Sequence, residues 1–135
     1  MNTLKAYWRT LLLIAIILFL SLMNINKVIP DEVHLHRHFD KFAHFMMYFA
    51  LSFVFFIENY RNKNSLRKFW IIFDTIALGI AVEFLQYLIT TNRTANIYDA
   101  LFNTLGVIVG SILYLLLKDN QFIYKLMLFK APYNK

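Results

Sequence analysis

Four apolar segments separated by short polar ones dominate the hydrophobic pattern of the chain. They lie within residues 6–23, 40–58, 69–90 and 98–117. Each segment approaches the ~20 residues that a helix needs to cross a hydrocarbon core about 30 Å thick. A backbone inside lipid has to satisfy its own hydrogen bonds, so these segments are expected to be helices. The pattern therefore predicts an all-α integral membrane four-helix bundle.

The first segment has a second interpretation as a cleaved signal peptide, because Lys5 and Arg9 precede its apolar stretch. Signal peptide cleavage sites need small residues. The sequence Ser21-Leu22-Met23-Asn24 is a poor match to such a site. We therefore interpret the first segment as a retained helix.

The overall composition supports a membrane protein. Hydrophobic residues make up 59% of the 135 residues and charged residues 16%, whereas soluble domains have about 45–50% and about 25%. A soluble chain of this length has little room to bury so much apolar surface. The length suits one domain, which we place at residues 1–135. The chain contains no cysteine, so disulfides and thiolate ligands are excluded.

Lysine and arginine are concentrated in three polar segments and give a net charge of +6. These are the N-terminal residues, residues 59–68 and the tail 118–135, whereas residues 24–39 and 90–97 carry fewer positive charges. Because basic segments stay cytoplasmic, both termini are predicted to be cytoplasmic. The topology accounts for the charge, so no nucleic-acid partner is expected. Apolar residues in the tail favour an interfacial helix there, with a solvated tail as the alternative.

Polar side chains inside the predicted spans require a partner or a function, because lipid does not solvate them. They occur on three of the predicted helices, at spacings of three or four residues that share a helix face, and Arg93 adds a cation from the loop between the last two helices. All of them map to the outer third of the bundle. We therefore expect a polar pocket that opens to the outer face. Its expected residues are Asp40, Lys41, His44, Tyr48, Glu83, Gln86, Arg93, Asp99 and Asn103.

Each of these residues also has a structural interpretation. Asp40 and Asp99 are candidates for helix caps. Glu83 is a candidate for an ion pair with Arg93 or Lys41. The buried amides would then join helices by hydrogen bonds, and no ligand would be needed.

Three glycines are expected at positions where helices pack closely. Gly106 and Gly110 form a small-xxx-small pattern on the last helix, which lets another helix approach. Gly79 is expected to have a similar role on the third helix.

The histidines at positions 34, 36 and 38 would lie on one side of an extended segment, where they could bind Zn²⁺. Ligands this close together need a further partner from elsewhere, and histidines are common in exposed loops. We assign no metal and no cofactor to the chain, and leave these three histidines open.

In their order and spacing, the polar residues resemble the VanZ-like family of small bacterial membrane proteins. Two departures are Thr90-Thr91-Asn92, where relatives often have a proline, and Asn96, where an acidic or hydroxyl residue would be expected. The resemblance implies a multi-pass protein of the bacterial cytoplasmic membrane. The family is named for low-level resistance to the glycopeptide teicoplanin, and its general activity is not settled. The matching fragments are Asp40-Lys41-x-x-His44 with Tyr48, Glu83-x-x-Gln86, Arg93, and Asp99-x-x-x-Asn103-x-x-Gly106-x-x-x-Gly110.

Three functions fit these residues, and membrane lipids are the expected partners. The first is binding of a phosphorylated lipid or a cell-wall precursor headgroup, with Lys41, His44 and Arg93 on the phosphate. Such a protein would affect teicoplanin susceptibility. The second is an intramembrane hydrolase or transferase acting on a lipid phosphate through His44 and a carboxylate. The third is a structural module that packs another protein, or a second copy, through the glycine face. The sequence leaves the ligand and the oligomeric state open.

Overall fold

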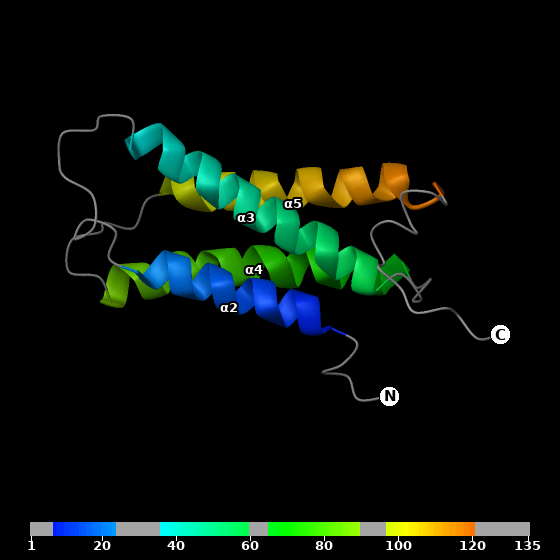
Figure 1. Ribbon diagram of the computed structural model, residues 1–135, viewed down its shortest axis with the longest axis horizontal. Coiled ribbons are helices and arrows are strands. Elements are labelled where there is room, and N and C mark those ends of the chain that lie inside the picture. The colour runs from blue at the N-terminus through cyan, green and yellow to red at the C-terminus, as the bar shows by residue number, and fades with distance from the viewer. Residues whose placement is uncertain (1–6, 24–35, 60–64, 90–96, 121–135) are drawn as a thin grey trace.

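The computed structural model describes residues 7–23, 36–59, 65–89 and 97–120, and every regular element in these ranges is an α-helix. The helices run alternately in opposite directions, so α2 begins and α5 ends at the same end of the bundle (Figure 1). The all-α four-helix prediction is confirmed, and the cytoplasmic location of that end stays a prediction. The four helices are α2 (Trp8–Leu22), α3 (His36–Glu58), α4 (Ser65–Ile89) and α5 (Ile97–Leu117).

Three of these helices are long and apolar enough to cross a membrane. Their candidate spans are Phe39–Glu58, Leu66–Ile89 and Ile97–Leu117. Helix α2 is also apolar but has 15 residues, which is about 22 Å at 1.5 Å per residue. Tyr7 and Met23, the residues on either side of it, have non-helical backbone angles. A full crossing by α2 therefore stays a prediction.

Two helices begin about one turn earlier than the hydrophobic pattern predicts, at His36 and Ser65. Hydropathy marks residues that prefer lipid, whereas a helix continues through polar residues as long as its backbone bonds continue. Asp40 therefore lies inside α3, and the prediction that it caps this helix is wrong. The backbone of His36 and His38 is helical, so an extended histidine segment is wrong for these two residues. His34 and the predicted interfacial helix of the tail lie outside the described residues.

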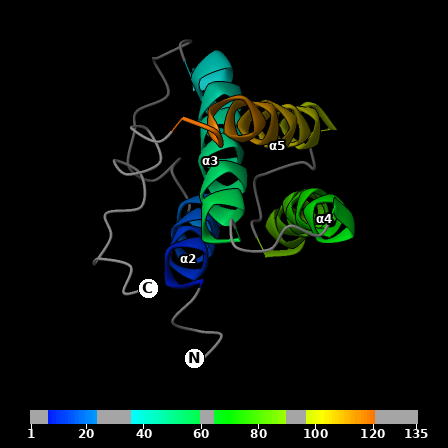
Figure 2. The ribbon, with the colours of Figure 1, turned by 90° about the vertical axis from the view of Figure 1, so that its right-hand side faces the viewer.

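Helix α3 runs diagonally through the bundle and contacts the other three helices. Figure 2 shows it passing from α5, beside its N-terminal half, toward α2. Its contact with α5 is the closest, because a Cβ at Gly106 would collide with the carbonyl oxygen of Phe45. A Cβ at Gly110 would lie 2.5 Å from the carbonyl oxygen of Phe49. The small-xxx-small face is thus covered by α3 of the same chain, which leaves no room there for another protein.

Two apolar clusters fill the interior of the bundle. The cluster nearer the start of α3 consists of Ile17, Tyr48, Leu51 and Val107, which come from α2, α3 and α5. The cluster nearer the end of α3 consists of Phe56, Ile57, Ile71 and Tyr114. Lipid chains are as apolar as these side chains, so burying the side chains inside the bundle brings no hydrophobic gain over leaving them in lipid. Close packing therefore has to hold the helices together.

The start of α2 is fixed by the carboxylate of Glu58, near the end of α3. The backbone N–H groups of Arg9 and Thr10 donate to it at 3.0 and 3.1 Å, and the Thr10 hydroxyl donates at 2.7 Å. The first N–H groups of a helix have no partner inside the helix and carry partial positive charge. Glu58 therefore caps α2 from a different helix.

Candidate functional site

Three buried polar side chains from three helices are joined by hydrogen bonds. Asn103 Nδ2 on α5 donates to Glu83 Oε1 on α4 at 3.0 Å. Asn103 Oδ1 lies 3.1 Å from His44 Nδ1 on α3, and Glu83 Oε1 lies 3.3 Å from the same nitrogen. All three residues are buried. This centre lies at the end of the bundle where α3 and α5 begin, which we call the polar end.

The carboxylate of Glu83 determines how the other two side chains are protonated and oriented. A carboxylate accepts hydrogen bonds, so the amide NH₂ of Asn103 faces it and the amide oxygen faces His44. His44 Nδ1 then has two acceptors in front of it and carries a proton. In the neutral imidazole the other nitrogen, Nε2, therefore presents a lone pair.

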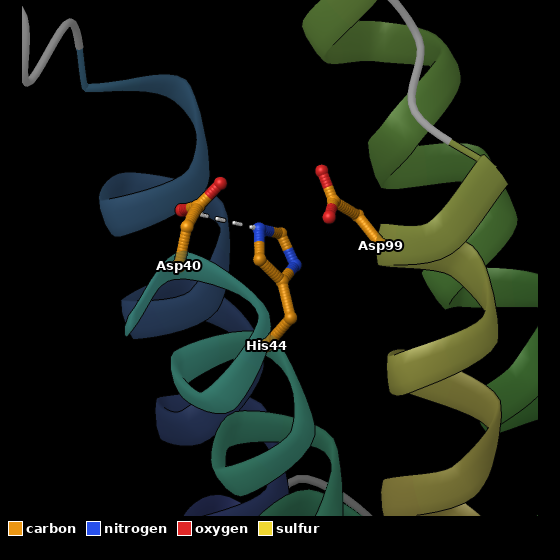
Figure 3. A group of neighbouring side chains, drawn as sticks. All are labelled: Asp40, His44 and Asp99. Atoms are coloured by element: carbon orange, nitrogen blue, oxygen red, sulfur yellow. Dashed lines mark ion pairs between the residues drawn. The ribbon is translucent and has the colours of Figure 1, made fainter. Parts of the chain in front are cut away.

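Two further carboxylates lie on either side of the His44 ring (Figure 3). Asp40 Oδ1 is 3.8 Å from His44 Nε2, and one ligand atom each from Asp40, His44 and Asp99 lie within 4.8 Å of one another. Asp99 is buried in the first turn of α5, where a negative charge complements the helix dipole. The Asp40 side chain is 36% exposed. The His44 cluster, which comprises Asp40, His44, Glu83, Asp99 and Asn103, therefore reaches the surface at Asp40.

The other predicted pocket residues lie around this cluster with different partners. Lys41 Nζ is 4.8 Å from the centroid of the Tyr98 ring, a cation–π contact. Gln86 Nε2 donates to the carbonyl oxygen of Ser21 at 2.8 Å, which ties α4 to the end of α2. Arg93 lies outside the described residues, so its participation stays a prediction.

Tyr48 lies one turn below His44 and is completely buried. A Cβ on Gly79 would lie 3.2 Å from its ring, so the phenol packs directly against α4. Within the described part of the chain the Tyr48 hydroxyl has no hydrogen-bond partner. An unsatisfied buried hydroxyl costs about 1–3 kcal/mol, so a water or ligand atom at this position would be favourable.

The sequence did not predict a cavity of about 480 Å³ at the opposite end of the bundle. Most of its lining side chains are apolar and resemble those of any membrane span, so their pattern carries no specific signal. Arg67 and Asp74, seven residues apart on one face of α4, are the charged exceptions and the one signal in the sequence that points to this region. The lining residues are Tyr7, Thr10, Leu11, Ile14, Phe55, Arg67, Trp70, Ile71 and Asp74.

The fold and the His44 cluster define a small helical membrane protein whose buried polar centre is assembled from three helices. The VanZ/LLP1 family matches residues 2–118, a range that includes all four helices. The chain belongs to this family, which confirms the membership predicted from the polar residues. Comparison with curated proteins and with solved structures gives no match.

Proposed function

We propose that the chain is a cell-envelope protein of the bacterial cytoplasmic membrane that binds a phosphorylated lipid or a cell-wall precursor headgroup at its polar end. The observation that carries this proposal is the His44 cluster, which joins α3, α4 and α5 and reaches the surface at Asp40. The candidate spans of α3 and α5 begin at Phe39 and Ile97. If these segments cross the membrane, Asp40, Lys41 and Asp99 lie at the depth of lipid headgroups.

Lysine and arginine at this depth suit an anionic headgroup. Lys41 adjoins Asp40 on α3, and Arg93 precedes α5 by only a few residues in the sequence. Arginine binds phosphate oxygens in a bidentate manner and lysine binds them as a point charge. In this proposal, both cations contact the phosphate, and the cluster behind them accepts hydrogen bonds from hydroxyl groups.

Native mass spectrometry of the full chain in nanodiscs tests the proposal, with phosphatidic acid as the probe and phosphatidylcholine as the neutral reference. We expect selective binding of phosphatidic acid by the wild type. Lys41→Ala and Arg93→Ala should each weaken it about tenfold or more, since a bond to a charged group contributes about 1.5–3 kcal/mol and about 1.4 kcal/mol is a factor of ten.

Lys118→Ala is the matched control, because Lys118 follows α5 at the opposite end. It should leave the affinity for phosphatidic acid unchanged. Equal losses in the three variants would indicate nonspecific attraction between a basic protein and an anionic lipid. Equal binding of the two lipids by the wild type would refute the proposal.

A second candidate is an intramembrane hydrolase or transferase acting on a lipid phosphate. It is favoured by the orientation of His44, whose Nδ1 is held by Asn103 and Glu83 while Nε2 faces Asp40. A general acid or base needs a ring whose orientation is fixed and a second nitrogen that can exchange a proton with the substrate. Release of labelled phosphate from a lipid panel by the wild type, abolished in His44→Ala, would support this reaction, and no turnover would exclude it for those lipids.

Binding of a cell-wall precursor would also change teicoplanin susceptibility. Expression of the wild type in a susceptible bacterium should then raise the minimum inhibitory concentration. Expression of Lys41→Ala to the same level should raise it less. An equal rise with both proteins would separate the resistance phenotype from headgroup binding.

A further inference from the structure

We propose that Asp40, His44 and Asp99 bind a divalent metal cation, of which zinc and manganese are the chemically suited examples. The three side chains offer one imidazole nitrogen and carboxylate oxygens from two different helices. Imidazole suits zinc and other transition metals, and carboxylate suits manganese. A mixed set of this kind is a more specific pattern than a group of acidic residues.

The hydrogen bonds of His44 supply an independent argument for a metal. Nδ1 faces Asn103 Oδ1 and Glu83 Oε1 at 3.1 and 3.3 Å. Because both are acceptors, we assign the proton to Nδ1. Nε2 is then left with its lone pair on the side of Asp40. Histidines that bind metals typically donate their other N–H to a carboxylate or a carbonyl oxygen, which fixes the tautomer and the ring orientation. Glu83 and Asn103 hold His44 in this way.

The distances allow coordination after a small movement of side chains. One atom from each ligand lies within 4.8 Å of the other two, and ligands of a zinc ion at about 2.1 Å are about 3–4 Å apart. Asp40 is 36% exposed, so its carboxylate has space to rotate toward the ring. Three protein ligands leave a coordination position for a water or a substrate oxygen.

The charge of the cluster also favours a cation. The carboxylates of Asp40, Glu83 and Asp99 surround one imidazole in a largely buried site. Carboxylate oxygens facing one imidazole favour a cation between them, and electrostatic attraction is strong where water is excluded. A bound ion would also explain how a site rich in carboxylates accepts a phosphate, because the ion would lie between the carboxylates and the phosphate and bind both. This bridging role rests on the proposed function, whereas the metal site itself does not.

Titration of the chelator-stripped full chain in nanodiscs with Mn²⁺ tests the site, because bound Mn²⁺ loses the electron paramagnetic resonance signal of the free ion. We expect a single saturable site. Asp40→Asn and Asp99→Asn should each weaken it about tenfold or more, and Glu83→Gln about 10–100-fold through His44. Asp119→Asn, at the opposite end, should have no effect. Thermal unfolding in metal-free buffer shows whether each variant folds.

Pulsed electron paramagnetic resonance of Mn²⁺ bound to the wild type is a test that does not depend on the folding of any ligand variant. It should detect a nitrogen nucleus of an imidazole bound to Mn²⁺. This signal should persist when His34, His36 and His38 are all replaced by glutamine. Absence of saturable binding, absence of the nitrogen signal, or its loss in the triple variant would overturn the site. Unchanged affinity in well-folded Asp40→Asn and Asp99→Asn proteins would also overturn it.

The bridging role has its own readout. Mn²⁺ should raise the affinity of the wild type for phosphatidic acid about tenfold or more, and it should have no such effect on Asp99→Asn. Competition by inorganic phosphate would show that the phosphate group alone is recognised. If Mn²⁺ binds but the affinity for phosphatidic acid is unchanged, the metal site stands and the bridging role fails. If the lipid binds equally well without any metal, the proposed function stands without it.

Discussion

At the scale of single residues, Asn103 has the strictest hydrogen-bonding requirement in the His44 cluster. Its amide group faces an acceptor on one side and an N–H donor on the other, so the two ends of the amide are not interchangeable. Helical spacing was sufficient to predict that Asn103, His44 and Glu83 lie at one depth. It was insufficient to predict their pairing, because this depends on how each helix is rotated. Gln86 illustrates this point, since it donates to the backbone of Ser21, a residue with no predicted role.

Asn103→Asp keeps the shape of the side chain and removes the donor to Glu83. Two carboxylates would then meet at about the 3.0 Å that now separates Asn103 Nδ2 from Glu83 Oε1. We expect the free energy of unfolding at neutral pH to fall by about 1–3 kcal/mol, the range for a buried polar group left without its partner. Thermal unfolding in detergent measures the loss. Asn120→Asp, the same change at an exposed position, should lose much less, and equal losses would contradict the assigned orientation.

At the scale of helices, the pairing of α3 with α5 depends on backbone contact. The glycine pattern predicted that a helix packs on this face, because small residues are needed where two backbones approach. It did not identify the partner, since any of the other spans could have packed there. The early start of α3 was also missed, because its first turn is polar and therefore has no hydropathy signal.

Gly106→Ala should destabilise the bundle by about 1–3 kcal/mol, the usual cost of forcing extra volume into a packed interface. This loss should exceed the gain of about 1 kcal/mol that alanine brings to a helix. Gly79→Ala is the comparison, because its Cβ would meet the Tyr48 side chain at 3.2 Å instead of a backbone atom. Unfolding in a denaturing detergent should therefore show a smaller loss for Gly79→Ala. The reverse order would argue against the α3–α5 contact.

Glu58→Ala should weaken the attachment of α2 to the bundle. The change removes the acceptor for two backbone N–H groups and for the Thr10 hydroxyl. The loss of a helix cap costs about 0.5–2 kcal/mol, so we expect a decrease of this size in unfolding free energy. Glu58→Gln, which keeps one acceptor oxygen, should lose less. Faster proteolysis near the start of α2 in Glu58→Ala would be a second measure, and wild-type behaviour of both variants would exclude the cap.

At the scale of the whole molecule, the alternating helix directions place the His44 cluster and the cavity at opposite ends. Hydropathy predicted the four helices, the order of the polar residues predicted the family, and their spacing predicted where the cluster would form. The cavity could not be predicted, since it results from the distances between α2, α3 and α4. Which end of the bundle faces the cytoplasm depends on how the protein inserts into the membrane. This orientation is therefore measured in cells.

Because the chain contains no cysteine, single reporter cysteines can test the orientation. Phe39→Cys marks the polar end and Asp119→Cys the opposite end, and both positions are exposed. If the basic segments are cytoplasmic, an impermeant maleimide added to intact bacteria should label Phe39→Cys only. Both proteins should react after permeabilisation. The opposite labelling pattern would place the polar end inside the cell.

The shortness of α2 has a mechanical consequence for the surrounding lipid. Its 15 residues extend about 22 Å, whereas the 25 residues of α4 beside it extend about 37 Å. A bilayer that fits α4 is too thick for α2, and a mismatch of this kind is relieved by local thinning, at a fraction of a kcal/mol per ångström. The acyl chains against α2 would therefore be compressed and more disordered than those on the far side. A protein whose hydrophobic length is shorter on the α2 side than on the other side would bend the two leaflets unequally. It would favour regions of short-chain lipid.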